Sequence, residues 1–250
     1  MFKGLFLTGS MLGMLGDFAQ EKGVNIPELN EAITLYGNQS RISLLLWTNL
    51  LERISVAVND PALGLAIGKR IAPRHVGVLG YLVLSCQSLG EALNRFARYQ
   101  RLVYDVNPFS VSVDERGMEL RWGVEYGKPG ALVDETSIAA LFNFLNILTS
   151  QPLHPSYVCF VNPQPKNLKT YLDYFKCPVD FEKDLLLSEK IKEKSKETLL
   201  KNYGVDNPMK SDQIKMSSKQ TNIDTKMIEN YNYFPYISID SNGNGLLIYT

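Results

Sequence analysis

The spacing of apolar residues changes period near the middle of the chain, and this change constrains the fold more than any other feature. Before residue 104, apolar residues recur every three or four positions, as in amphipathic helices. After it, Phe109, Val111 and Val113 alternate with polar residues, and a second alternating run spans residues 118–126. Residues 114–117 lie between the two runs. The pattern therefore predicts a helical first half followed by a β-hairpin with one apolar face.

The helices of the first half are predicted from their end signals as well as from their spacing. Gly23 is a plausible stop for a helix that begins near Met11, and Pro27 suits the first position of a short helix. Ser88 and Glu91 form a capping box, which opens a helix that we expect to run to about Tyr104. Two further helices are predicted over residues 42–58 and 62–71.

The hairpin is followed by alternating helices and strands. We expect a helix over residues 134–148, a strand over 157–161, a helix over 166–175 and a short strand over 184–188. The order predicts an α+β domain: a helical N-terminal half, then a small, mainly antiparallel sheet packed against helices in the order β-β-α-β-α-β. We place this domain at residues 1–200. Residues 201–250 lack clear periodicity and are expected to be a linker or a poorly structured tail.

Charge and composition exclude several classes of function. Lys plus Arg and Asp plus Glu both number 26, so the net charge is zero and the whole chain has no electrostatic attraction for nucleic acid or an anionic membrane. The three cysteines form no CxxC pair, which fits a reducing compartment. No apolar run approaches the length of a membrane span, and the first residues resemble a helix more than a signal peptide. We therefore expect a cytoplasmic protein.

No motif points to catalysis or to a metal or cofactor. The two histidines, His75 and His154, lie far apart and outside any nucleophile motif, and no glycine pattern forms a phosphate-binding loop. Residues 240–245 match the first half of a calcium-binding EF-hand loop, but the bidentate Glu is missing, and an Asn-Gly hairpin turn is the alternative. The expectation is a protein that is not an enzyme, with no catalytic residue, metal ligand or cofactor.

A set of short motifs occurs in a characteristic order along the chain. It comprises Arg41-Ile42-Ser43 with Trp47, Asp60-Pro61 with Leu63-Gly64-Leu65, Gly77-Val78-Leu79-Gly80-Tyr81-Leu82, Ser88-Leu89-Gly90-Glu91-Ala92-Leu93, Arg98-Tyr99-Gln100-Arg101-Leu102-Val103, and Phe175-Lys176-Cys177-Pro178-Val179. Over about residues 10–190, this set resembles the N-terminal effector-sensing (arabinose-binding-like) domain of AraC/XylS-type transcriptional regulators. The most similar subgroup has a helical N-terminal half and includes regulators of arginine and ornithine use.

The resemblance implies a domain that binds a small effector to control transcription, or that dimerises. In that family a pair of helix-turn-helix units contacts DNA, but no such unit is recognised after Leu200, where the chain has no Arg and no Ala. We therefore predict no DNA-binding residues here, and DNA contact only through a domain not seen in this chain. The alternative is a ligand-free dimerisation module that forms homodimers, or mixed dimers with a full-length regulator.

The candidate effector site follows from side-chain type and strand face. Trp122 and Tyr126 lie on the apolar face of the hairpin, and Phe144 lies on the helix expected to cover it. This face is either ordinary core or the lining of a ligand cavity. Arg98 is included because an amino-acid or organic-acid effector needs a charged partner, although Arg95, Arg98 and Arg101 also fit a solvated helix face.

Overall fold

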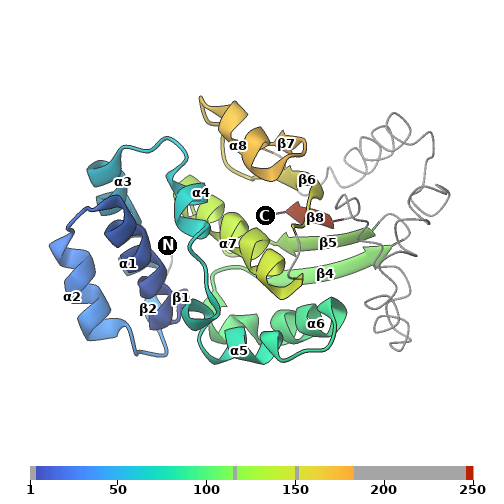
Figure 1. Ribbon diagram of the computed structural model, residues 1–250, viewed down its shortest axis with the longest axis horizontal. Helices are drawn as coiled ribbons and strands as arrows, with labels where there is room; N and C mark the ends of the chain where they lie inside the picture. The colour runs from blue at the N-terminus through green and yellow to red at the C-terminus, as the bar shows by residue number, and fades with distance from the viewer. Residues whose placement is uncertain (1–3, 115–116, 150–151, 183–245, 250) are drawn as a thin grey trace.

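The structure is a computed structural model that describes residues 4–114, 117–149, 152–182 and 246–249 (Figure 1). It confirms the α+β class. The helices are α1 (Leu12–Lys22), α2 (Pro27–Tyr36), α3 (Leu44–Val58), α4 (Leu63–Gly68), α5 (Val78–Leu84), α6 (Leu89–Tyr99), α7 (Ala131–Thr149) and α8 (Leu168–Phe175), with 3-10 turns η1 (Gly9–Met11), η2 (Pro73–Val76) and η3 (Gln100–Leu102). The strands are β1 (Phe6–Leu7), β2 (Ile42–Ser43), β3 (Tyr104–Asp105), β4 (Phe109–Asp114), β5 (Gly117–Trp122), β6 (Pro155–Cys159), β7 (Val179–Asp180) and β8 (Leu246–Tyr249).

The helix ends follow the predicted capping residues. Gly23 closes α1 in the left-handed conformation, with φ 65°, which a glycine adopts without strain. The Ser88 hydroxyl accepts a hydrogen bond from the backbone N–H of Glu91 at the start of α6, as the capping box predicts. Ser43 caps α3 in the same way through the N–H of Leu46.

A small three-stranded sheet was not predicted. Its order is β2-β1-β3, and both pairings are antiparallel. Each strand has only two residues, too few to show an alternating pattern, so the sequence gives no period-2 signal. The helix expected to reach about Tyr104 therefore ends at Tyr99, and the chain continues through η3 into β3.

The larger sheet has five strands in the order β4-β5-β8-β6-β7. The hairpin is confirmed, since β4 and β5 pair antiparallel with Phe109 opposite Trp122. The other three ladders are parallel, so this sheet is mixed where the sequence predicts a mainly antiparallel one. The helical crossover α8, between β6 and β7, returns the chain to the same end of the sheet, and such a connection makes neighbouring strands parallel.

Helix α7 is the central element of the fold. Figure 1 shows it crossing the middle of the molecule, between the N-terminal helices and the larger sheet. Its residues are divided between two apolar clusters, with Ala140 and Phe144 among the N-terminal helices and Leu141 and Leu145 against the sheet. By length and composition α7 could cross a membrane, but ten of its residues are buried inside the protein. We therefore assign it as a core helix.

Two glycines allow α4 to approach α7 closely. A Cβ atom at Gly64 would lie 2.4 Å from the Cβ of Glu135, and one at Gly68 would lie 2.6 Å from the Cβ of Ala139. Both separations are shorter than carbon atoms tolerate, so only glycine fits at these positions. The spacing of four residues places both glycines on one face of α4.

Some expectations fall outside the described residues. They are the short strand at 184–188, the calcium-loop match at 240–245, and all of residues 201–250 except 246–249. Residues 246–249, which lie in the expected tail, form β8 between β5 and β6 in the larger sheet. The domain boundary near residue 200 stays a prediction.

Candidate ligand-binding site

A partly open cavity of about 60 Å³ lies between α7, the end of β5 and the N-terminal helices. Helix α7 supplies one wall with Thr136, Ser137, Ala140, Leu141 and Phe144. These residues recur at helical spacing, so one stripe of α7 faces the cavity. The other walls come from Met11, Trp47, Ile71, Val76, Phe96, Val103, Tyr104 and Trp122, which are far apart in sequence.

The cavity wall is mainly hydrocarbon and aromatic, with a few polar atoms. The Ser137 hydroxyl lies 2.8 Å from the carbonyl oxygen of Val133 and 2.9 Å from the Tyr104 hydroxyl. Because Ser137 has one proton and donates it to that carbonyl, Tyr104 donates to Ser137. The Thr136 hydroxyl donates to the carbonyl oxygen of Leu132. Burial raises the pKa of Tyr104 well above its usual value, so its phenol is neutral.

Trp122 is the exception among these polar groups. Its side chain is 7% exposed, and its buried indole Nε1 has no hydrogen-bond partner among the described residues. An unsatisfied buried N–H costs about 1–3 kcal/mol. The packing around the Trp122 ring must therefore offset this cost.

A second, smaller hollow of about 10 Å³ shares Tyr104, Trp122 and Ser137 with the main cavity. Its lining also includes Asp134, which is 2% exposed and accepts a hydrogen bond of 2.7 Å from the Asn162 amide. The volume is close to the minimum that holds one water molecule. The polar atoms of the site thus lie at one end of an otherwise apolar space.

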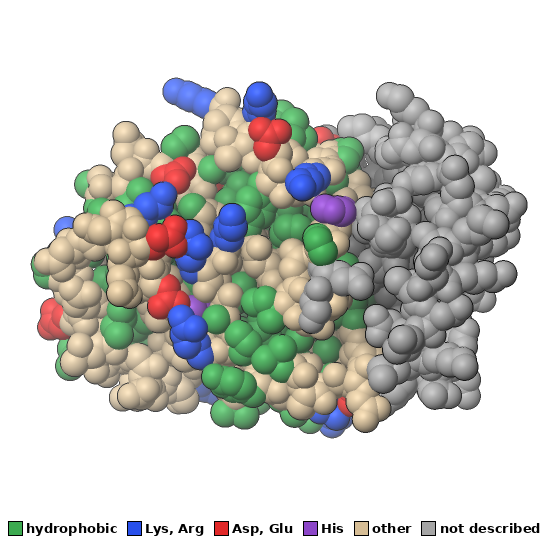
Figure 2. All heavy atoms as spheres, in the orientation of Figure 1, with side chains coloured by type: hydrophobic (Ala, Val, Ile, Leu, Met, Phe, Trp, Pro, Cys, Tyr) green, Lys and Arg blue, Asp and Glu red, His purple; other side chains and the backbone are tan. Residues whose placement is uncertain are grey.

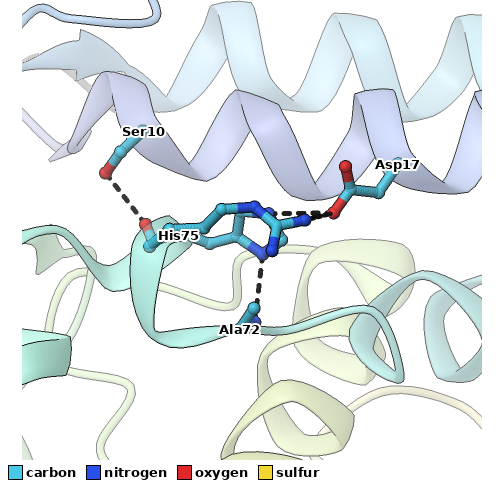
Figure 3. A network of polar contacts seen from close by, with 5 residues as sticks. Ser10, Asp17, Ala72 and His75 are labelled. Atoms are coloured by element: carbon cyan, nitrogen blue, oxygen red, sulfur yellow. Dashed lines mark hydrogen bonds and ion pairs between the residues drawn. The ribbon is translucent and has the colours of Figure 1, made fainter.

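The segment between α4 and α5 carries two cavity residues, Ile71 and Val76, and is held to α1 by polar contacts (Figure 3). His75 is 1% exposed, and its Nε2 lies 3.1 Å from Oδ2 of Asp17. Its Nδ1 accepts a hydrogen bond from the backbone N–H of Ala72, which places the proton of the neutral ring on Nε2. Burial lowers the pKa of His75 below 6.5, while the Asp17 charge acts in the opposite direction.

Two arginines extend this attachment at the surface. Arg74 forms an ion pair with Asp17, and Arg70 forms one with Glu21. Figure 2 shows basic and acidic side chains gathered in a band where the N-terminal helices meet the rest of the protein. Each exposed pair contributes little, about 0–1 kcal/mol. The buried His75 contact therefore does more to fix the segment.

A half-buried carboxyl, that of Glu135, lies on α7 beside the close contact with α4. The pKa of Glu135 is raised to about 7, chiefly by desolvation. The hydrogen bond from the Tyr171 hydroxyl acts in the opposite direction, and the neighbouring Asp134 charge adds to the rise. Near neutral pH this carboxyl is partly protonated. It does not line the main cavity.

The structure brings two of the four sequence-predicted site residues together. Trp122 and Phe144 both line the main cavity. Tyr126 is 47% exposed and Arg98 is also exposed, and neither belongs to the lining. Arg98 instead packs over the ring of Tyr99, its centre 5.4 Å away.

Sequence reasoning missed Tyr104 and Ser137, which supply two of the hydroxyl groups of the lining. Ser137 carried a recognisable signal, since it lies on the same helical stripe as Leu141 and Phe144 and is a hydroxyl on an otherwise apolar face. Tyr104 gave no such signal, because the two-residue strand that carries it is defined only by its partner β1.

Comparison with known proteins identifies the class and then the family. A family profile described as the arabinose-binding domain of AraC transcription regulators, at their N-terminus, matches residues 31–186. The α+β domain is thus a regulatory domain of the kind found in transcription regulators. More particularly, the chain belongs to the AraC-type family of N-terminal arabinose-binding domains, as the sequence motifs predict.

Two relatives are regulators from Pseudomonas aeruginosa. The ornithine utilization regulator is 28% identical over 173 residues, which are 66% of this chain and 51% of the relative. The crystal structure of the transcriptional regulator CdpR aligns with 17% identity and a TM-score of 0.46, over 69% of this chain and 51% of that chain. The chain therefore spans about half the length of these relatives.

Proposed function

We propose that this domain senses a small-molecule effector in the cavity beside α7 and thereby controls transcription in the cytoplasm. The observation that carries the proposal is the pocket itself, a mainly apolar space inside a domain of a regulator family. DNA would be contacted through another domain.

The position of the cavity suggests how binding could be transmitted. Its walls come from α7, from the segment 71–76 and from the N-terminal helices, so a ligand would contact residues of both apolar clusters. A ligand that fits one arrangement of these elements better than another shifts the population toward that arrangement. The His75 attachment would keep the segment 71–76 in its present place until the ligand moves it.

The lining favours an apolar effector over the amino-acid or organic-acid effector expected from the sequence. Neither described cavity is lined by a Lys or an Arg. A buried carboxylate without a cationic partner is strongly disfavoured. The effector body that contacts the cavity is therefore expected to be apolar.

A cavity-filling variant tests the proposal. Ala140→Leu adds side-chain volume to the lining, while Ala131→Leu adds the same volume at an exposed position of the same helix. Thermal unfolding is measured with a panel of small neutral metabolites, amino acids and organic acids. We expect at least one compound to stabilise wild type and Ala131→Leu by mass action, and not Ala140→Leu. Equal stabilisation of all three proteins would place the binding site elsewhere.

A further inference from the structure

The segment 71–76 forms part of the cavity wall and is fastened to the N-terminal elements at the same time. Its two end residues, Ile71 and Val76, line the cavity. Next to Val76, the backbone carbonyl of His75 accepts a hydrogen bond of 2.9 Å from the Ser10 hydroxyl, and the buried imidazole lies beside α1 (Figure 3). A displacement of His75 is therefore transmitted to the cavity wall.

The turn that carries His75 needs a neutral ring. Nδ1 of His75 accepts a hydrogen bond of 3.0 Å from the backbone N–H of Ala72, which closes the turn η2. A protonated imidazole carries an N–H at both nitrogens and has no acceptor, so protonation breaks this hydrogen bond and sets two N–H groups against each other. The ring has little room to turn away, because a Cβ atom at Gly13 of α1 would lie only 3.2 Å from its Cδ2.

The charges that face the ring come from α1 and from the turn itself. Oδ2 of Asp17 lies 3.1 Å from Nε2 of His75 and would attract a proton there, while the Arg74 guanidinium opposes a second positive charge. Further along α1, Glu21 is paired with Arg70. The other elements packed most closely against the turn, η1 and α5, carry no His, Lys, Arg or carboxylate side chain. Burial outweighs the attraction of Asp17 and lowers the pKa of His75, so the fastened segment holds the neutral ring.

We propose that His75 is a proton switch for the cavity: the neutral ring holds the segment 71–76 against α1, and protonation releases the segment and with it the wall formed by Ile71 and Val76. An effector that fits the closed wall favours the unprotonated, fastened segment, and acid weakens its binding. This second step rests on the proposed function, whereas the release of the segment does not.

Hydrogen exchange of the Ala72 amide tests the release without any ligand. Exchange is measured by NMR on the full ¹⁵N-labelled chain and converted to protection factors, which removes the intrinsic effect of pH on the exchange rate. A released His75 titrates with its ordinary pKa of 6.5, so the release equilibrium shifts by up to about tenfold between pH 7.5 and pH 5.5. We expect the Ala72 amide to lose protection severalfold over this range. The amide of Leu51, in the core of α3, should stay better protected than that of Ala72 at pH 5.5, since the release is local.

Two substitutions of His75 separate protonation from packing. His75→Asn removes titration but carries its amide oxygen as many bonds from Cβ as Nδ1, so it still accepts from Ala72. His75→Gln places its amide near the position of Nε2 instead and leaves the Ala72 N–H without this acceptor. We expect the protection of the Ala72 amide to be independent of pH in both variants and lower in His75→Gln. Equal dependence on pH in wild type and His75→Asn would overturn the switch. If neither variant folds, protection in wild type that does not fall between pH 7.5 and pH 5.5 overturns it.

Xenon tests the coupling between the switch and the cavity, because this apolar atom occupies small apolar cavities. Its binding is followed through the methyl signals of Ile71, Val76 and Ala140, which line the cavity. At a xenon concentration equal to its dissociation constant, the protection of the Ala72 amide should about double at constant pH, since xenon binds the closed form.

The outcomes separate this inference from the proposed function. If xenon shifts the methyl signals but leaves the protection of Ala72 unchanged, the segment does not control the cavity, while the cavity remains a binding site. If xenon shifts none of these signals, the cavity as a site for apolar molecules fails, and the coupling to an effector fails with it. The dependence of Ala72 protection on pH then decides the proton switch alone.

Discussion

At the scale of single residues, the clearest electrostatic feature is the buried His75 ring between Asp17 and the backbone of Ala72. Because burial lowers the pKa of His75 in the folded protein, the folded state favours the neutral ring. This contribution to stability is fully present above pH 6.5, the unfolded value, and is lost as the pH falls through the folded pKa. Acidification should therefore loosen the segment 71–76.

Two substitutions, one that removes a negative charge near His75 and one that removes a positive charge, test this description. The Asp17 charge raises the pKa of His75 and the Arg74 charge lowers it. We expect Asp17→Asn to lower the pKa of His75 further and Arg74→Gln to raise it. Proton NMR titration of the imidazole signals measures both, since the chain has only two histidines. The same direction of shift in both variants would contradict the assignment, and the His154 signal serves as the internal control.

The raised pKa of Glu135 predicts that stability depends on pH in the opposite direction. Its pKa is about 7 in the folded protein against 4.5 ordinarily, so the folded state binds the proton more tightly. Stability should fall as the pH rises from about 4.5 to about 7 and stay lower above that range. The groups that face this carboxyl are Asp134 and Tyr171.

Glu135→Gln removes this proton-binding site. We expect the variant to unfold at a higher urea concentration than wild type above pH 7, with the difference disappearing near pH 4.5. Glu31→Gln, at an exposed position of α2, is the control. Its difference from wild type in the urea concentration of unfolding should not change in this way with pH. A constant difference between variant and wild type at all pH values would exclude titration of Glu135 as the cause.

At the scale of secondary-structure elements, the contact between α4 and α7 sets the position of the cavity wall. A Cβ at Gly68 would lie 2.7 Å from both the backbone N of Ala140 and the carbonyl oxygen of Thr136. Ala140 and Thr136 line the cavity on the same helix. Moving α4 away from α7 would therefore change the site as well as the core.

Gly68→Ala is expected to destabilise the protein by about 1–3 kcal/mol, since overpacking of backbone outweighs the gain in helix propensity. Gly16→Ala is the matched control in α1. Its Cβ would meet only the terminal methyl group of Ile33, at 2.9 Å, and that flexible end can move. Urea unfolding of both variants measures the difference, and an equal or smaller loss in Gly68→Ala would contradict the close-packing description.

At the scale of the whole molecule, helix α7 connects the two apolar clusters, and we therefore expect both clusters to unfold together. Trp47 belongs to the cluster of N-terminal helices and Trp122 to the cluster at the sheet. Helix α7 contributes buried residues to both. The proposed single domain therefore predicts one cooperative transition.

The two tryptophans report on the clusters separately. In Trp122→Phe the fluorescence comes from Trp47, and in Trp47→Phe it comes from Trp122. For each variant, we expect the fluorescence transition in urea to coincide with the loss of helical circular dichroism of that same variant. Separated transitions within one variant would show that the clusters unfold independently, and the single-domain prediction would then be wrong.

The sequence by itself determined the elements that carry a strong local pattern. The helices α1, α3, α6 and α7 and the hairpin β4–β5 were predicted because their apolar spacing and caps act within a few residues of one another. The ordered motifs also indicated the family, which the match over residues 31–186 shows. Trp122 and Phe144 were placed in the candidate site from strand face and helix stripe alone.

Only the tertiary structure decided which distant residues meet. The two-residue strands β1, β2 and β3 are too short for any periodic signal and are defined by hydrogen bonds to remote partners. Tyr104, Ile71 and Val76 joined the cavity for the same reason, because loops and short strands place them there. Arg98 and Tyr126 lie outside the lining, since a residue's type indicates what it can bind and its neighbours in three dimensions decide whether it faces the site.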